Sequence, residues 1–454
     1  MKNHHQRLDS FQRMSSGRIE EQQVLKALIE DKSLTESLME KICNSSNLNQ
    51  AYKRVKANKG AAGVDGMTVE DLFAWIGEHK ASLIESLISG TYQPEPVLGV
   101  DIPKPGKNKG FRQLGIPCVV DRLVQQAILQ VLEPILDPTF SESSYGFRPG
   151  RSAHQALKRA REYVREGYEI VVDMDAEKFF DRVNHDRLMF SLSKRIGDKR
   201  LLKIIRRFLE AGMMKQGVCI ERKKGLSQGG PLSPLMSNLV LDELDKELER
   251  RGHKFCRYGD DCNIYVKSLR AGERVLKSIK QFLEKRLKLK VNETKSACAP
   301  VEERQFLGYR FSGGGKLVIA QHSLERVKDK VRKITRRNRG VSLEIVISEL
   351  NKTLRGWGNY FQLTQWPSQL ESLDSWIRHK VRCYRLKQKK RAWPIAKFLM
   401  NLGVPACSAW NLAKSGKGWW RLSASIPVHH AMNNVWFKEA GLIDLLSIKP
   451  LVKT

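Results

Sequence analysis

The stretch KFCRYGDDCNIYVKS, residues 254–268, places two adjacent aspartates, Asp260 and Asp261, between β-rich flanks. The flanks predict two short strands, and the polar centre predicts a tight turn between them. Two like charges a few ångströms apart disfavour joint ionisation, so the pair indicates a cation site. A solvated turn with no further role is the alternative, and this stretch alone does not decide between them.

A further carboxylate lies upstream, in VVDMDAEKFF, residues 171–180. The β-branched start predicts a buried strand and the end predicts a helix, so Asp175 would sit where the strand ends. Asp173 points to the same side of an extended strand, so spacing leaves both aspartates open. With Asp260 and Asp261, such a carboxylate would complete a set that holds two Mg²⁺ ions about 3.5–4 Å apart for in-line phosphoryl transfer.

The overall charge indicates a polyanionic partner. The chain has 80 Lys and Arg against 49 Asp and Glu among 454 residues, a formal net charge of +31. Such an excess repels itself unless the protein works against nucleic acid or another polyanion. A ribosomal or membrane-surface protein is the alternative. Nucleic acid is favoured because the charge accompanies a large apolar core, whereas a basic tail would stand apart from one.

The cysteines and apolar runs indicate the compartment. The eight cysteines are scattered without a CxxC pair or zinc-finger spacing, which fits a reducing environment. No apolar run approaches the ~18–20 residues that span a bilayer. The N-terminus lacks the apolar stretch of a signal peptide. The sequence therefore predicts a cytoplasmic protein without a membrane partner.

The length predicts two or three domains. Strand and helix patterns alternate through residues 90–312, which favours an α/β or α+β body. The pattern includes a hairpin around residues 105–110, a long helix that ends near Pro138, and helices up to Met214. After about His322 the composition becomes basic: residues 326–339 and 376–391 each carry eight Lys or Arg, with apolar residues at helical intervals.

Several motifs, in this order, resemble those of a group II intron reverse transcriptase over residues 38–450. The motifs are IPKPGKNKGFRQLGIP (102–117), SSYGFRPGRSAHQAL (143–157), DAEKFFD (175–181), SQGGPLSP (227–234), YGDD (258–261), LKVNETKS (289–296), QFLGYRF (305–311) and LRGWGNYFQ (354–362). One such match would be weak evidence, but eight in family order are strong.

The resemblance implies an α+β fold shaped like a right hand. Residues 38–312 would form fingers and palm, with an antiparallel sheet and helices. Residues 313–400 would form an α-helical thumb or maturase domain, and residues 401–454 a short nucleic-acid-binding region. Residues 1–37 would be a polar extension.

For the metal site, the resemblance implies Asp175, Ala176, Asp260 and Asp261 as the residues around two Mg²⁺ ions, with Mn²⁺ as a substitute. It selects Asp175 over Asp173 because the family places its aspartate four residues before the first aromatic, here Phe179.

For the nucleotide site, the resemblance implies that Lys104 and Arg112 grip the triphosphate of the incoming dNTP. An Arg suits this task because its planar fork binds phosphate oxygens bidentately. Phe180 corresponds to a steric gate that would clash with a ribose 2′-hydroxyl. Gln228 would contact the sugar and the template–nucleotide pair.

Three further residues belong to the same expectation. Ala176 and Phe179 would complete the dNTP site, and Lys295 would protonate the departing pyrophosphate. Read without the resemblance, Phe180 is a core aromatic, Arg112 and Lys104 are surface charge, and Gln228 is a helix-entry turn residue.

The expected activity is RNA-directed DNA synthesis from a DNA or RNA primer on an RNA template, together with binding of structured intron RNA to assist splicing and retrohoming. A free-standing relative that serves host DNA repair is one alternative, and a splicing cofactor without polymerase activity is another. Basic helices with aromatics suit an RNA surface, although Trp357 and Tyr360 are expected in the core. The oligomeric state stays open.

Two features depart from the family pattern. Gly259 stands where intron-encoded members usually carry Ala. The HNH endonuclease domain of many relatives has no counterpart, and His429 and His430 do not form a convincing metal pair, so DNA cleavage is not predicted.

Overall fold

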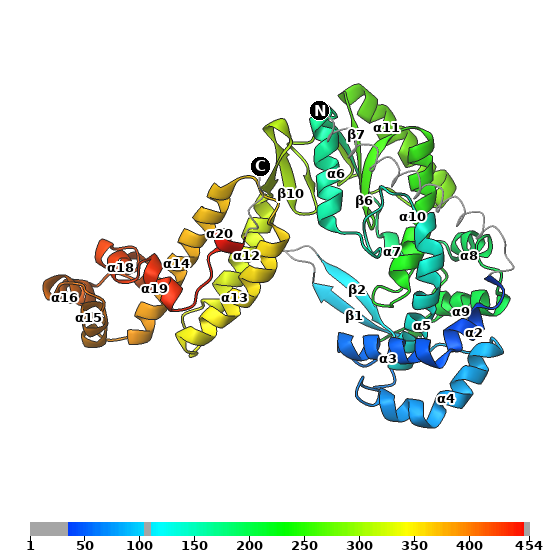
Figure 1. The fold of residues 1–454 in the computed structure, drawn as a ribbon, viewed down its shortest axis with the longest axis horizontal. Helices are drawn as coiled ribbons and strands as arrows, with labels where there is room; N and C mark the ends of the chain where they lie inside the picture. Colours follow the sequence, from blue (N-terminus) through cyan, green and yellow to red (C-terminus); the bar gives the residue numbers. More distant parts are fainter. Residues whose placement is uncertain (1–34, 104–109, 449–454) are drawn as a thin grey trace, which may run out of the picture. The chain divides into compact units, whose positions relative to one another are not determined.

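The computed structural model describes residues 35–103 and 110–448 (Figure 1). The chain divides into two compact units, unit 1 (Met1–Pro300) and unit 2 (Val301–Thr454). The resemblance implied a boundary after residue 312, and the division between the two units lies after Pro300. Residues just after Pro300 fold into a sheet that packs in unit 2, where the Tyr309 hydroxyl donates to the Tyr360 carbonyl at 2.7 Å.

Unit 1 is an α+β body, as the sequence predicted. Its helices are α2 (Leu38–Cys43), α3 (Ser45–Asn58), α4 (Leu72–Ile88), α5 (Val119–Leu136), η2 (Asp137–Thr139), α6 (Ala153–Arg165), α7 (Phe179–Arg182), α8 (His185–Ser193), α9 (Lys199–Glu210), α10 (Ser233–Arg250), α11 (Leu269–Phe282) and the π-helical turn η3 (Leu283–Leu287). Its strands are β1 (Val97–Pro103), β2 (Phe111–Ile116), β3 (Ile170–Asp175), β4 (Met213–Lys215), β5 (Val218–Ile220), β6 (Lys254–Tyr258), β7 (Asp261–Val266) and β8 (Ala297–Pro300).

The central sheet of unit 1 has the strand order β6-β7-β3-β8, and each neighbouring pair is antiparallel. Its strands are rich in β-branched and aromatic residues that fit a buried pleated surface, and every residue of β7 after Asp261 is buried. The predicted strand–turn–strand at residues 254–266 is β6 and β7. Helix α6 packs on β6, and α11 packs on β3 and β8 (Figure 1). This sheet carries the aspartates.

A second sheet has the order β2-β1-β4-β5. The predicted hairpin is present, with β1 and β2 antiparallel and Ile102 opposite Arg112. Its turn, and with it Lys104, lies outside the described residues. Strand β4 pairs parallel to β1, so Met213 and Met214 are in a strand and not at the end of a helix as expected.

Two long helices form the centre of unit 1. Helix α5 is buried along most of its length and ends next to Pro138, as predicted. Helix α10 begins at Ser233 with a proline in its first turn, where the missing N–H costs nothing. It also buries polar side chains, among them Asn238 and Asp245, whose partners lie under the aspartate-bearing turn.

Unit 2 is mostly helical. Its elements are β9 (Gln305–Phe306), β10 (Tyr309–Ser312), η4 (Gly313–Gly315), β11 (Lys316–Ile319), α12 (Gln321–Ile334), α13 (Leu343–Tyr360), α14 (Pro367–Lys389), α15 (Ala392–Asn401), α16 (Ala406–Lys414), α17 (Trp419–Leu422), α18 (Ile426–Ala431), α19 (Asn434–Glu439) and α20 (Leu445–Ile448). The two basic stretches are helices α12 and α14, as predicted. Trp357 and Tyr360 are half-buried and not fully enclosed.

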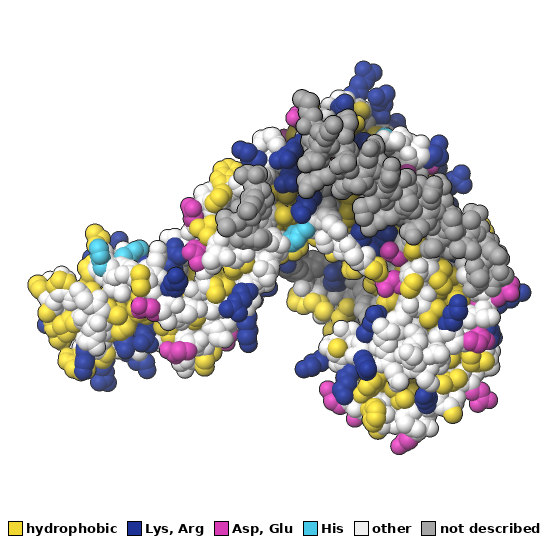
Figure 2. Space-filling model, in the orientation of Figure 1, with side chains coloured by type: hydrophobic (Ala, Val, Ile, Leu, Met, Phe, Trp, Pro, Cys, Tyr) yellow, Lys and Arg dark blue, Asp and Glu magenta, His cyan; other side chains and the backbone are white. Residues whose placement is uncertain are grey.

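Lys and Arg side chains are spread over the visible face of both units, with Asp and Glu in isolated places between them (Figure 2). Across residues 35–103 and 110–448, no helix has both the length and the apolar character that crossing a membrane requires.

Candidate active site

A cavity of about 890 Å³ opens beside the central sheet of unit 1. It gathers eight of the residues singled out in the sequence. They are Arg112, Asp175, Ala176, Phe179, Phe180, Gln228, Asp260 and Lys295. Residues far apart in the chain thus line one space, as a catalytic site requires.

Strand register brings the carboxylates together. Asp175 is the last residue of β3 and lies directly opposite Asp261, the first residue of β7. Asp261 is also opposite Tyr258 across the turn, so Asp260 projects from the tip between β6 and β7. The three aspartates therefore lie at the same end of the sheet, and of them Asp175 and Asp260 line the cavity.

Crowding and burial make these carboxylates hard to ionise together. Burial first, and then the neighbouring carboxylates, led by Asp173, raise the pKa of Asp261 to about 8. Burial is also the main cause that raises the pKa of Asp260. Both residues are half-buried. A cation among them would stabilise the charged forms.

Asp175 is held by the segment that follows η3. The Asn292 amide donates to its carboxylate at 3.0 Å, and the Lys295 ammonium donates to the two carboxylate oxygens at 3.2 and 3.3 Å. The Ser296 hydroxyl accepts from the Asp175 backbone N–H at 3.0 Å. Asn292 and Ser296 were missed by the sequence reasoning, although both lie in the LKVNETKS motif from which only Lys295 was chosen.

Asp173 is separated from Asp175 by its surroundings. It pairs in register with Asn263 inside the sheet and does not line the cavity. Its charge still acts on Asp261. The structure thus distinguishes two aspartates that strand spacing alone left equivalent.

The two phenylalanines after β3 lie in different environments. Phe179 is buried, and its ring meets the Phe180 ring edge-on with centroids 5.4 Å apart. Phe180 is only half-buried and lines the cavity. An edge-on aromatic contact against a fixed core ring limits how far the Phe180 side chain can yield.

Arg112 and Gln228 approach the cavity from different elements. Arg112 is exposed on β2, and its charge acts on Asp260. The Gln228 carbonyl accepts from the Gly115 N–H at 3.1 Å, which ties its turn to β2. Gly229 has φ +141°, and a Cβ there would lie 2.5 Å from the Gly115 carbonyl oxygen, so only glycine fits this turn.

Unit 2 has a smaller pocket of about 310 Å³. Its walls include His322, Arg326 and Lys330, which recur every four residues on α12, and the aromatic residues Trp357 and Tyr360 of α13. No carboxylate lines it. Basic and aromatic groups together suit the phosphates and bases of nucleic acid.

Comparison with known proteins agrees with this geometry. The family described as "Reverse transcriptase (RNA-dependent DNA polymerase)" matches residues 102–311, and the family described as "Group II intron, maturase-specific domain" matches residues 324–401. The first match covers the cavity and the second covers most of the basic helices.

Two named proteins are similar in sequence to parts of this chain. Protein YkfC of Escherichia coli is 33% identical over 304 residues, which are 58% of this chain and 79% of that protein. The group II intron-encoded protein LtrA of Lactococcus lactis is 38% identical over 208 residues, 46% of this chain and 34% of LtrA. The chain thus spans about a third of LtrA.

Among solved structures, a partial Cas6-RT-Cas1–Cas2 complex is 30% identical over 55% of this chain and 43% of the matched chain, with a TM-score of 0.37. The two family matches and the length of YkfC that is covered suffice, and the chain belongs to the group II intron reverse transcriptase and maturase family.

Proposed function

We propose that this protein is an RNA-directed DNA polymerase that extends a DNA or RNA primer with dNTPs on an RNA template. The observation that carries the proposal is the cavity in which Asp175 and Asp260 lie beside Arg112, Phe180 and Gln228. Nucleotidyl transfer needs carboxylates that bind metal ions, a cationic side chain that binds the phosphates, and a ring that packs against the sugar.

The residues present fit divalent cations by their chemistry. Asp175, Asp260 and Asp261 offer only oxygen ligands, which Mg²⁺ prefers, and the raised pKa of Asp261 reflects charge that a cation would balance. Within residues 35–103 and 110–448, no three His, Cys, Asp or Glu side chains form a ready-made metal site. The fit therefore rests on donor type and on the register of Asp175 with Asp261. When bound, two Mg²⁺ ions would activate the primer hydroxyl and stabilise charge on the transferred phosphoryl group.

The other groups would then orient the substrate. Arg112 would bind triphosphate oxygens, and Lys104, outside the described residues, would assist it. Phe180 would lie under the sugar and exclude a 2′-hydroxyl, with Ala176 and Phe179 beside it and Gln228 against the base pair. Lys295 would protonate pyrophosphate as it leaves. Its contact with Asp175 at 3.2 Å supports this assignment.

We further propose that the protein binds structured intron RNA through unit 2 and assists splicing in the cytoplasm. The maturase match over residues 324–401 and the basic helices α12 and α14 support this role. A role in host DNA repair would use the same catalytic residues.

Primer extension on an RNA template with dNTPs and Mg²⁺ tests the polymerase proposal. Asp260→Asn should lower the rate by about 10³-fold or more, since a metal contributes several kcal/mol of charge stabilisation. The matched control is Asp186→Asn, because the Asp186 side chain is 82% exposed and makes only a surface ion pair with Arg206.

Extension that is lost in Asp260→Asn and kept in Asp186→Asn supports the proposal. A wild-type protein that extends primers on neither RNA nor DNA, yet binds structured RNA tightly, would instead be a splicing cofactor.

A further inference from the structure

Phe147 is an unusual residue beside the aspartate-bearing turn. Its side chain is 53% exposed although phenylalanine is among the most apolar residues. Its backbone is left-handed, with φ +56°, a conformation that bulky residues rarely adopt. Its ring centroid lies 6.1 Å from that of Tyr258. Strained, exposed aromatic residues of this kind are found at functional sites.

Gly259, on the turn itself, faces that ring. Gly259 has φ +65°, and a Cβ there would lie 3.0 Å from the Phe147 ring. Gly146 packs against the same turn, since a Cβ there would lie 2.3 Å from the Gly259 nitrogen. The ring of Phe147 therefore lies where a side chain at position 259 would extend. The backbone around Gly146 is in contact with the backbone of the turn at Gly259.

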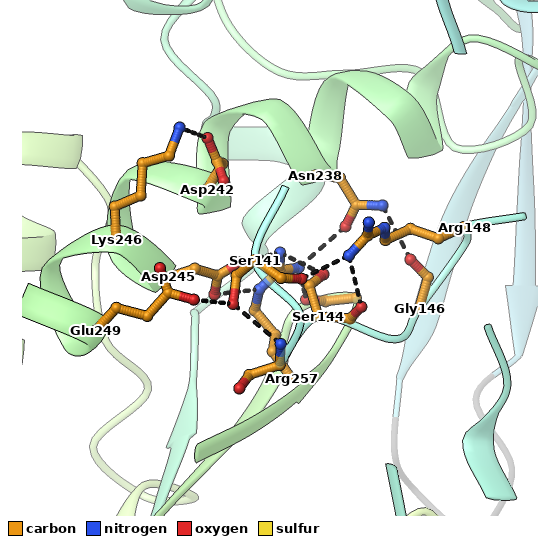
Figure 3. A network of polar contacts seen from close by, with 12 residues as sticks. Ser141, Ser144, Gly146, Arg148, Asn238, Asp242, Asp245, Lys246, Glu249 and Arg257 are labelled. Atoms are coloured by element: carbon orange, nitrogen blue, oxygen red, sulfur yellow. Dashed lines mark hydrogen bonds and ion pairs between the residues drawn. The ribbon is translucent and has the colours of Figure 1, made fainter. Parts of the chain in front are cut away.

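A buried guanidinium holds both segments (Figure 3). Arg257 is fully buried and pairs with Asp245 of α10 at 2.5 Å. It donates to the Gly259 carbonyl at 2.9 Å and to the Ser144 hydroxyl at 2.7 Å. Because a buried charge needs its partners, this group resists movement of either segment.

Asn238 of α10 completes the connection (Figure 3). Its side-chain oxygen accepts from Arg257 at 3.0 Å, and its amide nitrogen donates to the Gly146 carbonyl at 2.9 Å. The position of Phe147 relative to Gly259 is thus fixed by the fully buried side chains of Asn238, Asp245 and Arg257.

We propose that Phe147 positions the terminal nucleotide of the primer, and that Gly259 leaves the space that the ring and this nucleotide need. The inference rests on the polymerase function proposed above. Asp260 follows Gly259, so their Cα atoms are about 3.8 Å apart. A nucleotide is larger than this distance. A terminal nucleotide with its 3′-hydroxyl at Asp260 therefore reaches the Phe147 ring beside Gly259. Stacking on an exposed aromatic ring accepts any base.

The test is steady-state primer extension with Phe147→Ala, Phe147→Tyr and Gly259→Ala. Phe147→Ala should raise the KM for primer–template about tenfold, with little change in the KM for dNTP, and Phe147→Tyr should restore it. The matched control is Phe190→Ala, because Phe190 is 60% exposed on α8. The midpoint of thermal unfolding should not change in Phe147→Ala, which separates primer contact from a role in folding.

The double variant tests the pairing. Gly259→Ala should lower extension more in the presence of Phe147 than in Phe147→Ala, because only the ring crowds the added methyl group. Independent effects of the two substitutions, or a KM for primer–template that stays at the wild-type value in Phe147→Ala, would overturn the inference.

Equilibrium binding tests the role of Phe147 separately from the proposed polymerase activity. Affinity for a duplex with a recessed primer end should fall in Phe147→Ala and not in Phe190→Ala, whether or not the wild type extends primers. Equal affinities in the two variants would overturn the inference. Absence of extension in the wild type would overturn only the polymerase function.

Discussion

The cavity of unit 1 and the pocket of unit 2 use charge differently. In the cavity, carboxylates lie opposite cationic side chains at defined positions. The contact between the Lys295 ammonium and the Asp175 carboxylate is an example. In the pocket, Arg326 and Lys330 carry the same charge and stand with His322 on one helix face. Opposed charges at fixed positions suit chemistry, whereas repeated like charges suit a polyanion whose position can vary.

The comparison predicts the largest loss for a single carboxylate. Asp175→Asn should reduce primer extension by about 10³-fold, because it removes a ligand charge where metal stabilises the transition state. Asp173→Asn is the comparison: it is the same change two residues away, at a side chain that does not line the cavity although its charge acts on Asp261. Single-turnover extension measures both, and a loss in Asp173→Asn as large as in Asp175→Asn would remove the distinction.

A smaller effect is expected for sugar selection. Phe180→Ala should admit ribonucleotides and lower the preference for dNTP over rNTP by about 100-fold, the discrimination that an apolar pocket reaches against one added hydroxyl. The preference is measured as the ratio of kcat/KM values. Phe398→Ala, in unit 2, is the control. Unchanged discrimination in Phe180→Ala would refute the gate assignment.

The smallest effect is expected in the pocket of unit 2. Arg326→Ala and Lys330→Ala should each weaken RNA binding a few-fold and reduce the slope of log K against log salt concentration by about 1. The kcat for extension should not change. Lys203→Ala in α9 of unit 1 provides the control charge deletion. A salt slope equal to that of the wild type would mean that the pocket does not face phosphates.

The sequence predicted the elements that bear local patterns. The strands around residues 258–261, the hairpin at residues 97–116 and the opening of α10 each have a periodicity or turn chemistry of their own. The fold class and the family were therefore predictable. The eight predicted site residues that line the cavity were found through motifs, since no spacing rule joins Arg112 to Asp260.

What the sequence did not predict depends on tertiary contact. Arg257 is one basic residue among many, and its complete burial follows only from Asp245 and Asn238 on a helix that precedes it. Phe147 was part of a motif without a role, because its exposure and left-handed backbone are visible only in three dimensions. The parallel pairing of β4 with β1 depends likewise on residues far apart in the chain.

The pairing of Asp175 with Asp261 also determines where the chain tolerates a change in length. One residue inserted in β3 would turn Asp175 to the opposite face of the sheet and bury a charge among apolar side chains. The turn between β4 and β5, where exposed Gln216 and Gly217 have φ values of +50° and +81°, ends a hairpin at the edge of its sheet. A reporter peptide or affinity tag belongs in that turn, whereas an in-frame insertion in β3 would act as a null allele whatever residue it adds.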